Sequence, residues 1–314
     1  MGVPVAITLA LVLEQTLNGL QYGVMLFLMA AGLTLVFGIM NLVNLAHGSL
    51  YMVGAYLATA LARWSGSFVL GVALALPGTL LVGILVEVVV LRTLYEREHL
   101  DQVLATFGLI LFFNELIAII WGRAAIYTSV PPFLSGHIRV LPGVPYPTYR
   151  AGIILVGIAV AVLLWVLVTR TRLGMRIRAG ATNRTMISAL GVNIRLLYTL
   201  VFGVGAALAG LAGAMAGPIY SVQPGMGEGI LIQVFVVIVI GGIGSIRGAM
   251  VGAIVVGMAD TLGRAFLKPM LATVISPPAA DKAGPALASM SIYLLMAAVL
   301  FFRPEGLFPA RSRS

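Results

Sequence analysis

The sequence contains no cysteine, and only ten acidic residues and three histidines among its 314 positions. The lack of cysteine excludes disulfide bonds, thiolate metal sites and cysteine nucleophiles. Charged residues make up 9% of the chain, whereas soluble proteins carry about 25%. Burial does not account for this shortage, because a larger soluble domain would still need a hydrated surface. Most of the protein surface must therefore face lipid.

Hydrophobic residues make up 61% of the chain and form continuous runs rich in Leu, Val, Ala and Gly. Runs of about 18 or more apolar residues indicate transmembrane helices. We predict an all-α polytopic membrane protein, a single transmembrane domain over 1–314 with about 8–10 helices and Gly-rich broken segments. The short apolar stretch 5–13 is expected to form a separate helix on the bundle or to lengthen the first span. The expected spans are 19–40, 48–63, 67–91, 102–121, 150–168, 197–217, 230–246, 248–267 and 287–302.

Arginine is concentrated between residues 170 and 195, and no acidic residue occurs from 116 to 227. Loops rich in Lys and Arg lie on the cytoplasmic side of membranes, so we assign the loop 169–196 to the cytoplasm. Counting spans from there places 122–149 and 268–286 outside and the C-terminal tail, with its arginines, inside. Both external loops contain several prolines and are expected to be irregular. The net charge of +9 is thereby explained without nucleic acid as a partner.

Two polar or glycine-rich breaks interrupt the apolar runs: NLVNLAHGSL at 41–50 and GGIGSIRG at 241–248. Non-helical backbone at membrane depth is tolerated only where it is buried in protein or lines a wet cavity. We predict that both breaks line a translocation path. The residues assigned to it are Asn41, Asn44, His47, Ser49, Gly241, Gly242, Gly244 and Ser245. Alternatively, Asn41, Asn44 and His47 only satisfy the backbone groups that the break frees.

His47 has no second His, Asp or Glu at metal-ligand spacing, so no metal site is expected. An intramembrane hydrolase would pair His47 with Ser49 or Ser245, but there is no GxSxG motif. A stand-alone channel or ion-coupled carrier is a further alternative. It would need carboxylates in mid-membrane as ligands for a coupling ion, and the sequence offers few.

Three acidic residues fall within apolar spans, where a charge costs about 2.5–3.5 kcal/mol on insertion scales. Glu87 lies near the inner end of its span and is expected to extend to the membrane surface. Glu115 and Asp260 are expected to form structural pairs with arginine, although proton transport is an alternative role. The candidate partners are Arg123, Arg247 and Arg264.

A stripe of small residues, Ala206, Gly210 and Ala214, recurs at four-residue spacing. Small residues let membrane helices approach closely, so this stripe predicts packing within the bundle.

Within the arginine-rich loop, Thr182 or Asn183 is placed to cap a short helix, MISAL supplies apolar residues, and Gly191 is placed to end it. Such a helix suits docking into the groove of a cytoplasmic partner. The alternative is that it lies on lipid headgroups.

Three segments carry a resemblance to a known family: GLTLVFGIMNLVNLAHGSLYMVGAYLA, TRLGMRIRAGATNRTMISALGVN and VIGGIGSIRGAMVGAIVVGMAD. From about residue 15 to the C-terminal FFRPEGLF, the chain resembles the smaller membrane subunit of high-affinity branched-chain amino-acid ABC importers. The resemblance implies a permease of the bacterial inner membrane that transports branched-chain or other neutral amino acids. It also implies a homologous second permease subunit, two cytoplasmic ATPase subunits and a periplasmic binding protein as partners.

In the family, the cytoplasmic loop carries a helix that couples the permease to the ATPase. RAGATN stands here where the general importer signature begins Glu-Ala-Ala, which leaves Gly191 as the main match. No GxxxxGKS occurs, so ATP and Mg are expected on the partner subunits, and no enzymatic activity or cofactor is expected in this chain. The coupling residues implied by the resemblance are Arg178, Ala179, Asn183, Met186, Ala189, Leu190 and Gly191.

Overall fold

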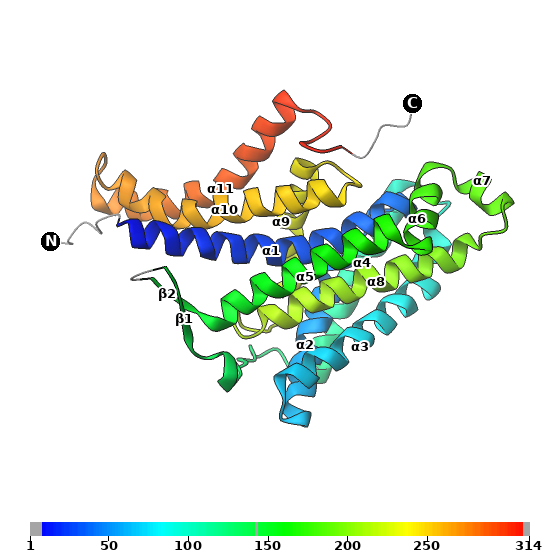
Figure 1. Cartoon of the computed structure of the whole chain (residues 1–314), viewed down its shortest axis with the longest axis horizontal. Coiled ribbons are helices and arrows are strands. Elements are labelled where there is room, and N and C mark those ends of the chain that lie inside the picture. Colours follow the sequence, from blue (N-terminus) through cyan, green and yellow to red (C-terminus); the bar gives the residue numbers. More distant parts are fainter. Residues whose placement is uncertain (1–7, 142–143, 310–314) are drawn as a thin grey trace.

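The computed structural model describes residues 8–141 and 144–309, which form a bundle of helices with one β-hairpin (Figure 1). Seven of these helices, α1, α3, α4, α5, α8, α10 and α11, are long and apolar enough to cross a membrane. The prediction of an all-α polytopic membrane protein is confirmed. The elements are α1 (Leu9–Met40), α2 (His47–Ser65), α3 (Phe68–Val89), η1 (Leu91–Leu94), α4 (His99–Trp121), η2 (Pro132–Leu134), β1 (His137–Leu141), β2 (Val144–Pro147), α5 (Thr148–Arg170), α6 (Arg172–Thr182), α7 (Arg184–Ala189), α8 (Ile194–Ala216), α9 (Met226–Gly241), α10 (Ile246–Leu271) and α11 (Pro277–Phe302).

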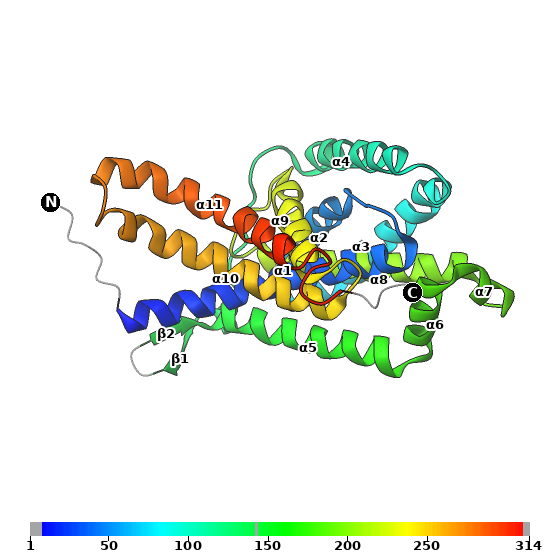
Figure 2. The same cartoon turned by 90° about the horizontal axis from the view of Figure 1, so that it is seen from above.

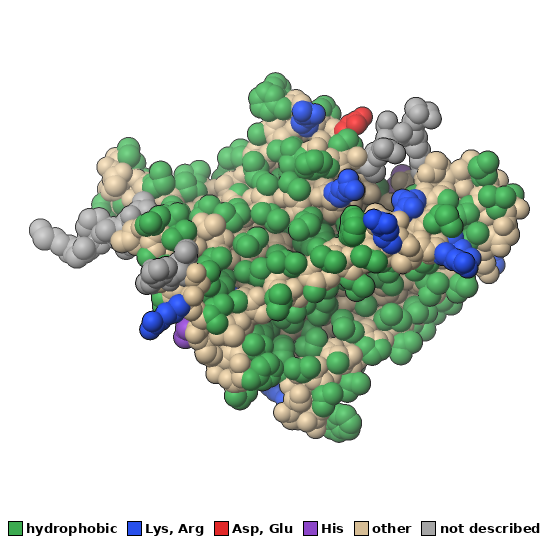
Figure 3. Space-filling view, in the orientation of Figure 1, with side chains coloured by type: hydrophobic (Ala, Val, Ile, Leu, Met, Phe, Trp, Pro, Cys, Tyr) green, Lys and Arg blue, Asp and Glu red, His purple; other side chains and the backbone are tan. Residues whose placement is uncertain are grey.

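The bundle has two distinct ends, which we name by their most prominent features. The helices α6 and α7 form the arginine end, and the antiparallel pair β1–β2 forms the hairpin end (Figures 1 and 2). Apolar side chains cover much of the visible flank between the ends, and several Lys and Arg side chains gather toward the arginine end (Figure 3). This distribution is the one expected of a bundle whose flank is solvated by lipid.

The first helix is longer than its predicted span because the polar run EQTLNGLQ does not interrupt it. Residues 1–7 lie outside the described residues, but the rest of the short apolar stretch belongs to α1. The side chain of Thr8 caps the helix by accepting a hydrogen bond from the backbone N–H of Leu11 at 3.3 Å. The expectation of a longer first span is therefore correct, and that of a separate short helix is wrong.

The helices α2 and α9 account for the two remaining predicted spans, but both begin inside the bundle. His47, the first residue of α2, contacts the carbonyl oxygen of Met29 through its Nε2 at 3.2 Å. Met29 lies eleven residues before the end of α1, or about 16 Å along the helix axis. Gly48 of α2 in turn lies against Gly227 of α9. The segment 41–46 therefore returns from the end of α1 toward the middle of the bundle.

Small residues set how closely the central helices pack. A Cβ atom on Gly54 of α2 would lie 2.2 Å from the Cα of Gly210 in α8, and one on Gly83 of α3 would lie 2.3 Å from the Cβ of Ala206. Ala214 packs with Ala58 and Ala75 in a small cluster. The predicted stripe on α8 is thus confirmed as a packing surface against α2 and α3.

The two loops predicted to be irregular contain more regular structure than expected. Within 122–149 the chain forms η2 and the hairpin, which is tied to α1 by a hydrogen bond from the Tyr146 hydroxyl to the carbonyl oxygen of Leu17 at 3.1 Å. Within 268–286, α10 continues to Leu271 and α11 begins at Pro277. Proline is favoured in the first turn of a helix, where its missing N–H needs no partner. Pro277 and Pro278 therefore start α11, whereas Pro269 and Pro285 lie inside α10 and α11.

The crossing of α2 and α8 provides a test of this packing. We expect Gly54→Ala to lower the free energy of unfolding by about 1–3 kcal/mol, because the added methyl group overlaps the Gly210 backbone. The matched control is Gly108→Ala in α4, where nothing lies within 4 Å of the added Cβ. Thermal unfolding of the two purified variants in detergent measures the difference. An equal melting temperature for both would contradict the close packing.

Candidate functional site

A polar cavity of about 770 Å³ lies in the hairpin half of this otherwise apolar bundle. It is bounded by α1, α2, α5, α9, α10 and the segment between α8 and α9. A volume of about 300–1,000 Å³ is typical of small-molecule sites. Its polar side chains are Gln15, Asn18, Gln21, Tyr22, Tyr51, Arg150, Tyr220, Ser221, Gln223, Asp260, Thr261 and Arg264.

The charged groups of this cavity come from α5 and α10. The Asp260 carboxylate accepts two hydrogen bonds from Arg264 one helical turn later, both at 2.9 Å. The Asp260 side chain is 7% exposed and that of Arg264 is 54% exposed. Arg150 donates to the side-chain oxygen of Asn18 at 2.5 Å. The Tyr22 hydroxyl donates to Gln233 of α9 and so joins the cavity wall to that helix.

The residues of the first predicted break have local roles in the backbone. Asn41 ends α1 in the left-handed region with φ 53°, and its N–H donates to the carbonyl oxygen of Phe37 at 2.9 Å. The Asn44 side chain accepts from the N–H of Ala46 at 3.0 Å. Asn44 and His47 are completely buried. The side chains of Asn44 and His47 thus pair with backbone groups, whereas Asn41 contributes through its backbone, and contact with solute stays a prediction.

The second predicted break lies at the arginine end. Gly242 and Gly244 have φ values of 105° and 82°, and Ser245 caps α10 by accepting from the N–H of Gly248 at 3.0 Å. A segment near the C-terminus covers the break, since Leu307 and Phe308 donate backbone hydrogen bonds to Ile240 and Gly241, both at 2.9 Å.

The structure brings the last turn of α1, just before the first break, close to the second break. A Cβ on Gly38 would lie 3.7 Å from Gly244, whereas Asn44 and His47 lie deeper in the bundle. None of the eight residues predicted for the path lines the large polar cavity. Ser49 lines a separate narrow crevice with Asn114 and Glu228, between α2, α4 and α9.

His47 and the two candidate serines do not have the geometry of a hydrolase. Within the described part of the chain, neither Ser49 nor Ser245 is hydrogen-bonded to His47, and the Nδ1 atom of His47 has no partner. A serine nucleophile requires a base within hydrogen-bonding reach. The arrangement therefore gives no support to the hydrolase alternative.

The helices α6 and α7 protrude from the bundle at the arginine end (Figures 1 and 2). The Asn183 side chain caps α7 by accepting from the N–H of Met186 at 2.9 Å, and Gly191 follows the helix with φ 83°. The predicted start and end of this short helix are confirmed. Ile187 is buried, whereas Met186 and Leu190 are 65% and 77% exposed. All seven residues predicted to couple the chain to an ATPase are exposed on this protrusion.

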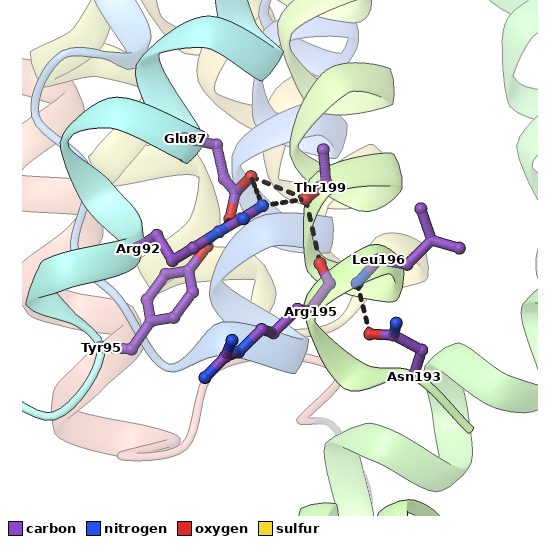
Figure 4. A network of polar contacts seen from close by, with 7 residues as sticks. All are labelled: Glu87, Arg92, Tyr95, Asn193, Arg195, Leu196 and Thr199. Carbon is purple, nitrogen blue, oxygen red and sulfur yellow. Dashed lines mark hydrogen bonds and ion pairs between the residues drawn. The ribbon is translucent and has the colours of Figure 1, made fainter. Parts of the chain in front are cut away.

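Next to the protrusion, a buried carboxylate joins α3, η1 and α8 (Figure 4). Glu87 is completely buried and accepts from Arg92 at 3.1 Å, Thr199 at 2.7 Å and the Tyr95 hydroxyl at 2.5 Å. Burial and the hydrogen bond to Glu87 raise the pKa of Tyr95, so that its hydroxyl stays protonated and donates. The expectation that Glu87 extends to the membrane surface is therefore wrong, because its three donors lie within the bundle.

The Glu87 network continues to α7 through aromatic rings. The rings of Tyr95 and Tyr198 meet edge to face at 5.2 Å between centroids, and Arg184, the first residue of α7, lies 5.8 Å over the Tyr198 ring. The other two acids in apolar spans form the expected pairs with arginine, Glu115 with Arg123 and Asp260 with Arg264.

Sequence reasoning missed most of the cavity, whose lining residues come from five helices and one irregular segment. One signal was present in α1: Gln15, Asn18 and Tyr22 recur at helical spacing and so form a polar stripe on one face. The apolar helices and the cavity among them define a polytopic membrane protein with a polar cavity of small-molecule size. Comparison with known proteins identifies the family.

Residues 15–300 match the family model described as "Branched-chain amino acid transport system / permease component". The chain is 32% identical to the high-affinity branched-chain amino acid transport system permease protein BraD of Pseudomonas aeruginosa, over 94% of this chain and 95% of that protein. It is 30% identical to the corresponding protein LivH of Escherichia coli K12, over 84% and 90%. A probable LivH of Methanocaldococcus jannaschii is 27% identical over 77% and 78%. No solved structure gives a significant match.

This chain therefore belongs to the family of branched-chain amino-acid transport permeases. It is a multi-pass membrane protein and a permease subunit, and its relatives are transport proteins and not enzymes.

The Glu87 network predicts a measurable contribution to stability. Glu87→Gln preserves the size of the side chain but removes the charge that its three donors share. We expect this change to lower the free energy of unfolding by about 1–3 kcal/mol. The control is Glu96→Gln, the same substitution at an exposed position in the turn after η1. Chemical or thermal unfolding in detergent compares the variants, and an unchanged Glu87→Gln protein would show that the network adds no stability.

Proposed function

We propose that this permease subunit forms part of an ABC importer of the bacterial inner membrane and passes branched-chain or other neutral amino acids through its helical bundle. Family membership supports the transport role, because the relatives at 30–32% identity are named as branched-chain amino-acid permeases. The observation that carries the path is the polar cavity of about 770 Å³ inside an apolar bundle.

The arginine end is the cytoplasmic end in this proposal, which follows the general distribution of basic residues in membrane proteins. The hairpin end and the cavity then face the periplasm, where a binding protein would deliver solute. The described part of the C-terminal tail lies beside Gly241 at the arginine end, and its last arginines, Arg311 and Arg313, lie outside the described residues.

Entry and exit use different parts of the chain. Solute enters the cavity in the hairpin half and moves toward the place where α2 and α9 begin. Gly48 and Gly227 lie in contact there, so passage requires these two helix starts to separate. The break at 41–46 then borders the exit, which is how the predicted residues Asn41, Asn44 and His47 take part.

Energy comes from other subunits in this proposal. Two cytoplasmic ATPases bind ATP and Mg, and a homologous permease subunit completes the membrane part. The exposed residues Met186 and Leu190 of α7 fit the apolar groove of a cytoplasmic partner. The contacts from Arg184 through Tyr198 and Tyr95 to Glu87 link α7 to α3 and α8.

A flux measurement in reconstituted vesicles distinguishes this proposal from the alternative of a stand-alone carrier. We expect the purified chain alone to give no amino-acid flux, and the complex with both ATPases, the second permease and the binding protein to give uptake that requires ATP. Uptake by the chain alone, at a rate similar to that of the complex, would overturn the importer proposal.

The docking role of α7 gives a second prediction. We expect Leu190→Glu to reduce the ATP hydrolysis stimulated by loaded binding protein by at least about tenfold, since burying an unpaired charge in an interface costs several kcal/mol. Leu190→Met preserves the apolar contact and should behave as the unmodified protein. Hydrolysis is measured in the assembled complex. An unaltered rate for Leu190→Glu would count against docking through this helix.

A further inference from the structure

The charged groups in the cavity are not explained by packing. A charge in a membrane span costs about 2.5–3.5 kcal/mol on insertion scales, and this chain has few charges to place. An ion pair that served only to join two turns of α10 could lie on a helix face that is packed against other helices. The Asp260–Arg264 pair instead lines the polar cavity of about 770 Å³, and the Arg264 side chain is 54% exposed.

The pair also leaves capacity for another group. An ionised carboxylate offers about four acceptor positions, and Arg264 occupies two of those of Asp260. The remaining positions can accept the N–H groups of an ammonium ion. A buried carboxylate beside a polar cavity therefore suits a cationic group of a ligand.

Arg150 supplies a positive group, which can bind an anionic group of the ligand. The guanidinium group of Arg150 forms no salt bridge within residues 8–141 and 144–309. It donates a hydrogen bond to the neutral side chain of Asn18. The cavity thus holds two guanidinium groups against one carboxylate, an excess of one positive charge. Guanidinium groups bind carboxylates with directed hydrogen bonds.

We infer that the cavity binds the charged end of a free amino acid, with Arg150 on the carboxylate and Asp260 on the ammonium group. Arg264 positions Asp260 and balances its charge. Met226, Ile230 and Ala265 give an apolar part of the lining for the aliphatic side chain. A neutral sugar would not use the two charges, and a simple anion would not use Asp260. This inference rests on the proposed function and names the groups by which the path recognises its solute.

The test uses the complete complex in detergent without binding protein, so that any binding is to the membrane subunits. Three probes are compared by saturation-transfer NMR: L-leucine, leucinol, which lacks the carboxylate, and 4-methylpentanoate, which lacks the amine. We expect the unmodified complex to bind leucine at least about tenfold more tightly than either analogue.

The variants connect each charge to one group of the probe. In Arg150→Gln, leucine should bind no better than leucinol, and Arg150→Lys should restore part of the preference. In Asp260→Asn, leucine should bind no better than 4-methylpentanoate. Arg150→Gln preserves the Asp260–Arg264 pair, so it keeps the test valid if Asp260→Asn does not fold. Lys268→Gln removes an exposed cation outside the cavity and serves as the control.

Two different failures are distinguishable. If Arg150→Gln and Asp260→Asn both assemble and still prefer leucine as the unmodified complex does, the inference is overturned while the importer function stands. The same holds if the unmodified complex imports leucine with ATP but does not discriminate among the three probes. If the complex imports no amino acid at all, the proposed function itself fails.

Discussion

The contact between Gly48 and Gly227 is the constraint on which the rest of the bundle depends. A Cβ on either residue would lie 2.4 Å or less from the carbonyl oxygen of the other, so two helix starts can meet there only because both lack side chains. Because α2 and α9 begin at this depth, the chain must reach the middle of the bundle twice without regular helix. Those two segments leave backbone groups that side chains must pair, as Asn44 does for Ala46 and Asn114 does for Gly225.

The same constraint creates room for polar chemistry. Since α9 begins only at Met226, the irregular segment before it presents Tyr220 and Gln223 to the cavity. The carboxylates Glu87 and Asp260 lie in different parts of the bundle. Glu87 lies at the arginine end, where its contacts reach α7 through Tyr95 and Tyr198, and Asp260 lines the cavity. Glu87 and Asp260 each lie beside an arginine, whereas Glu228 at the start of α9 accepts from the neutral Asn114.

Features that depend only on residues close together in the sequence could be predicted from it. The apolar runs predicted nine helices because membrane-spanning length is a local property, and Asn183 and Gly191 marked the ends of α7 for the same reason. The depth of α2 and α9 could not be predicted, because it depends on a contact between residues far apart in the chain. The cavity was missed for a similar reason, apart from the polar stripe of Gln15, Asn18 and Tyr22. Glu87 was misplaced because one of its three donors, Thr199, comes from α8, far away in the sequence, although Arg92 and Tyr95 follow Glu87 within eight residues.

The segment after α11 completes a helix that was synthesised long before it. The last carbonyl groups of α9 have no partners within that helix, and the backbone of Leu307 and Phe308 pairs those of Ile240 and Gly241. The end of α9 therefore gains these partners only after α10, α11 and the segment that follows them have been synthesised. Until residues 307 and 308 have been made, the carbonyl groups of Ile240 and Gly241 lack these backbone donors.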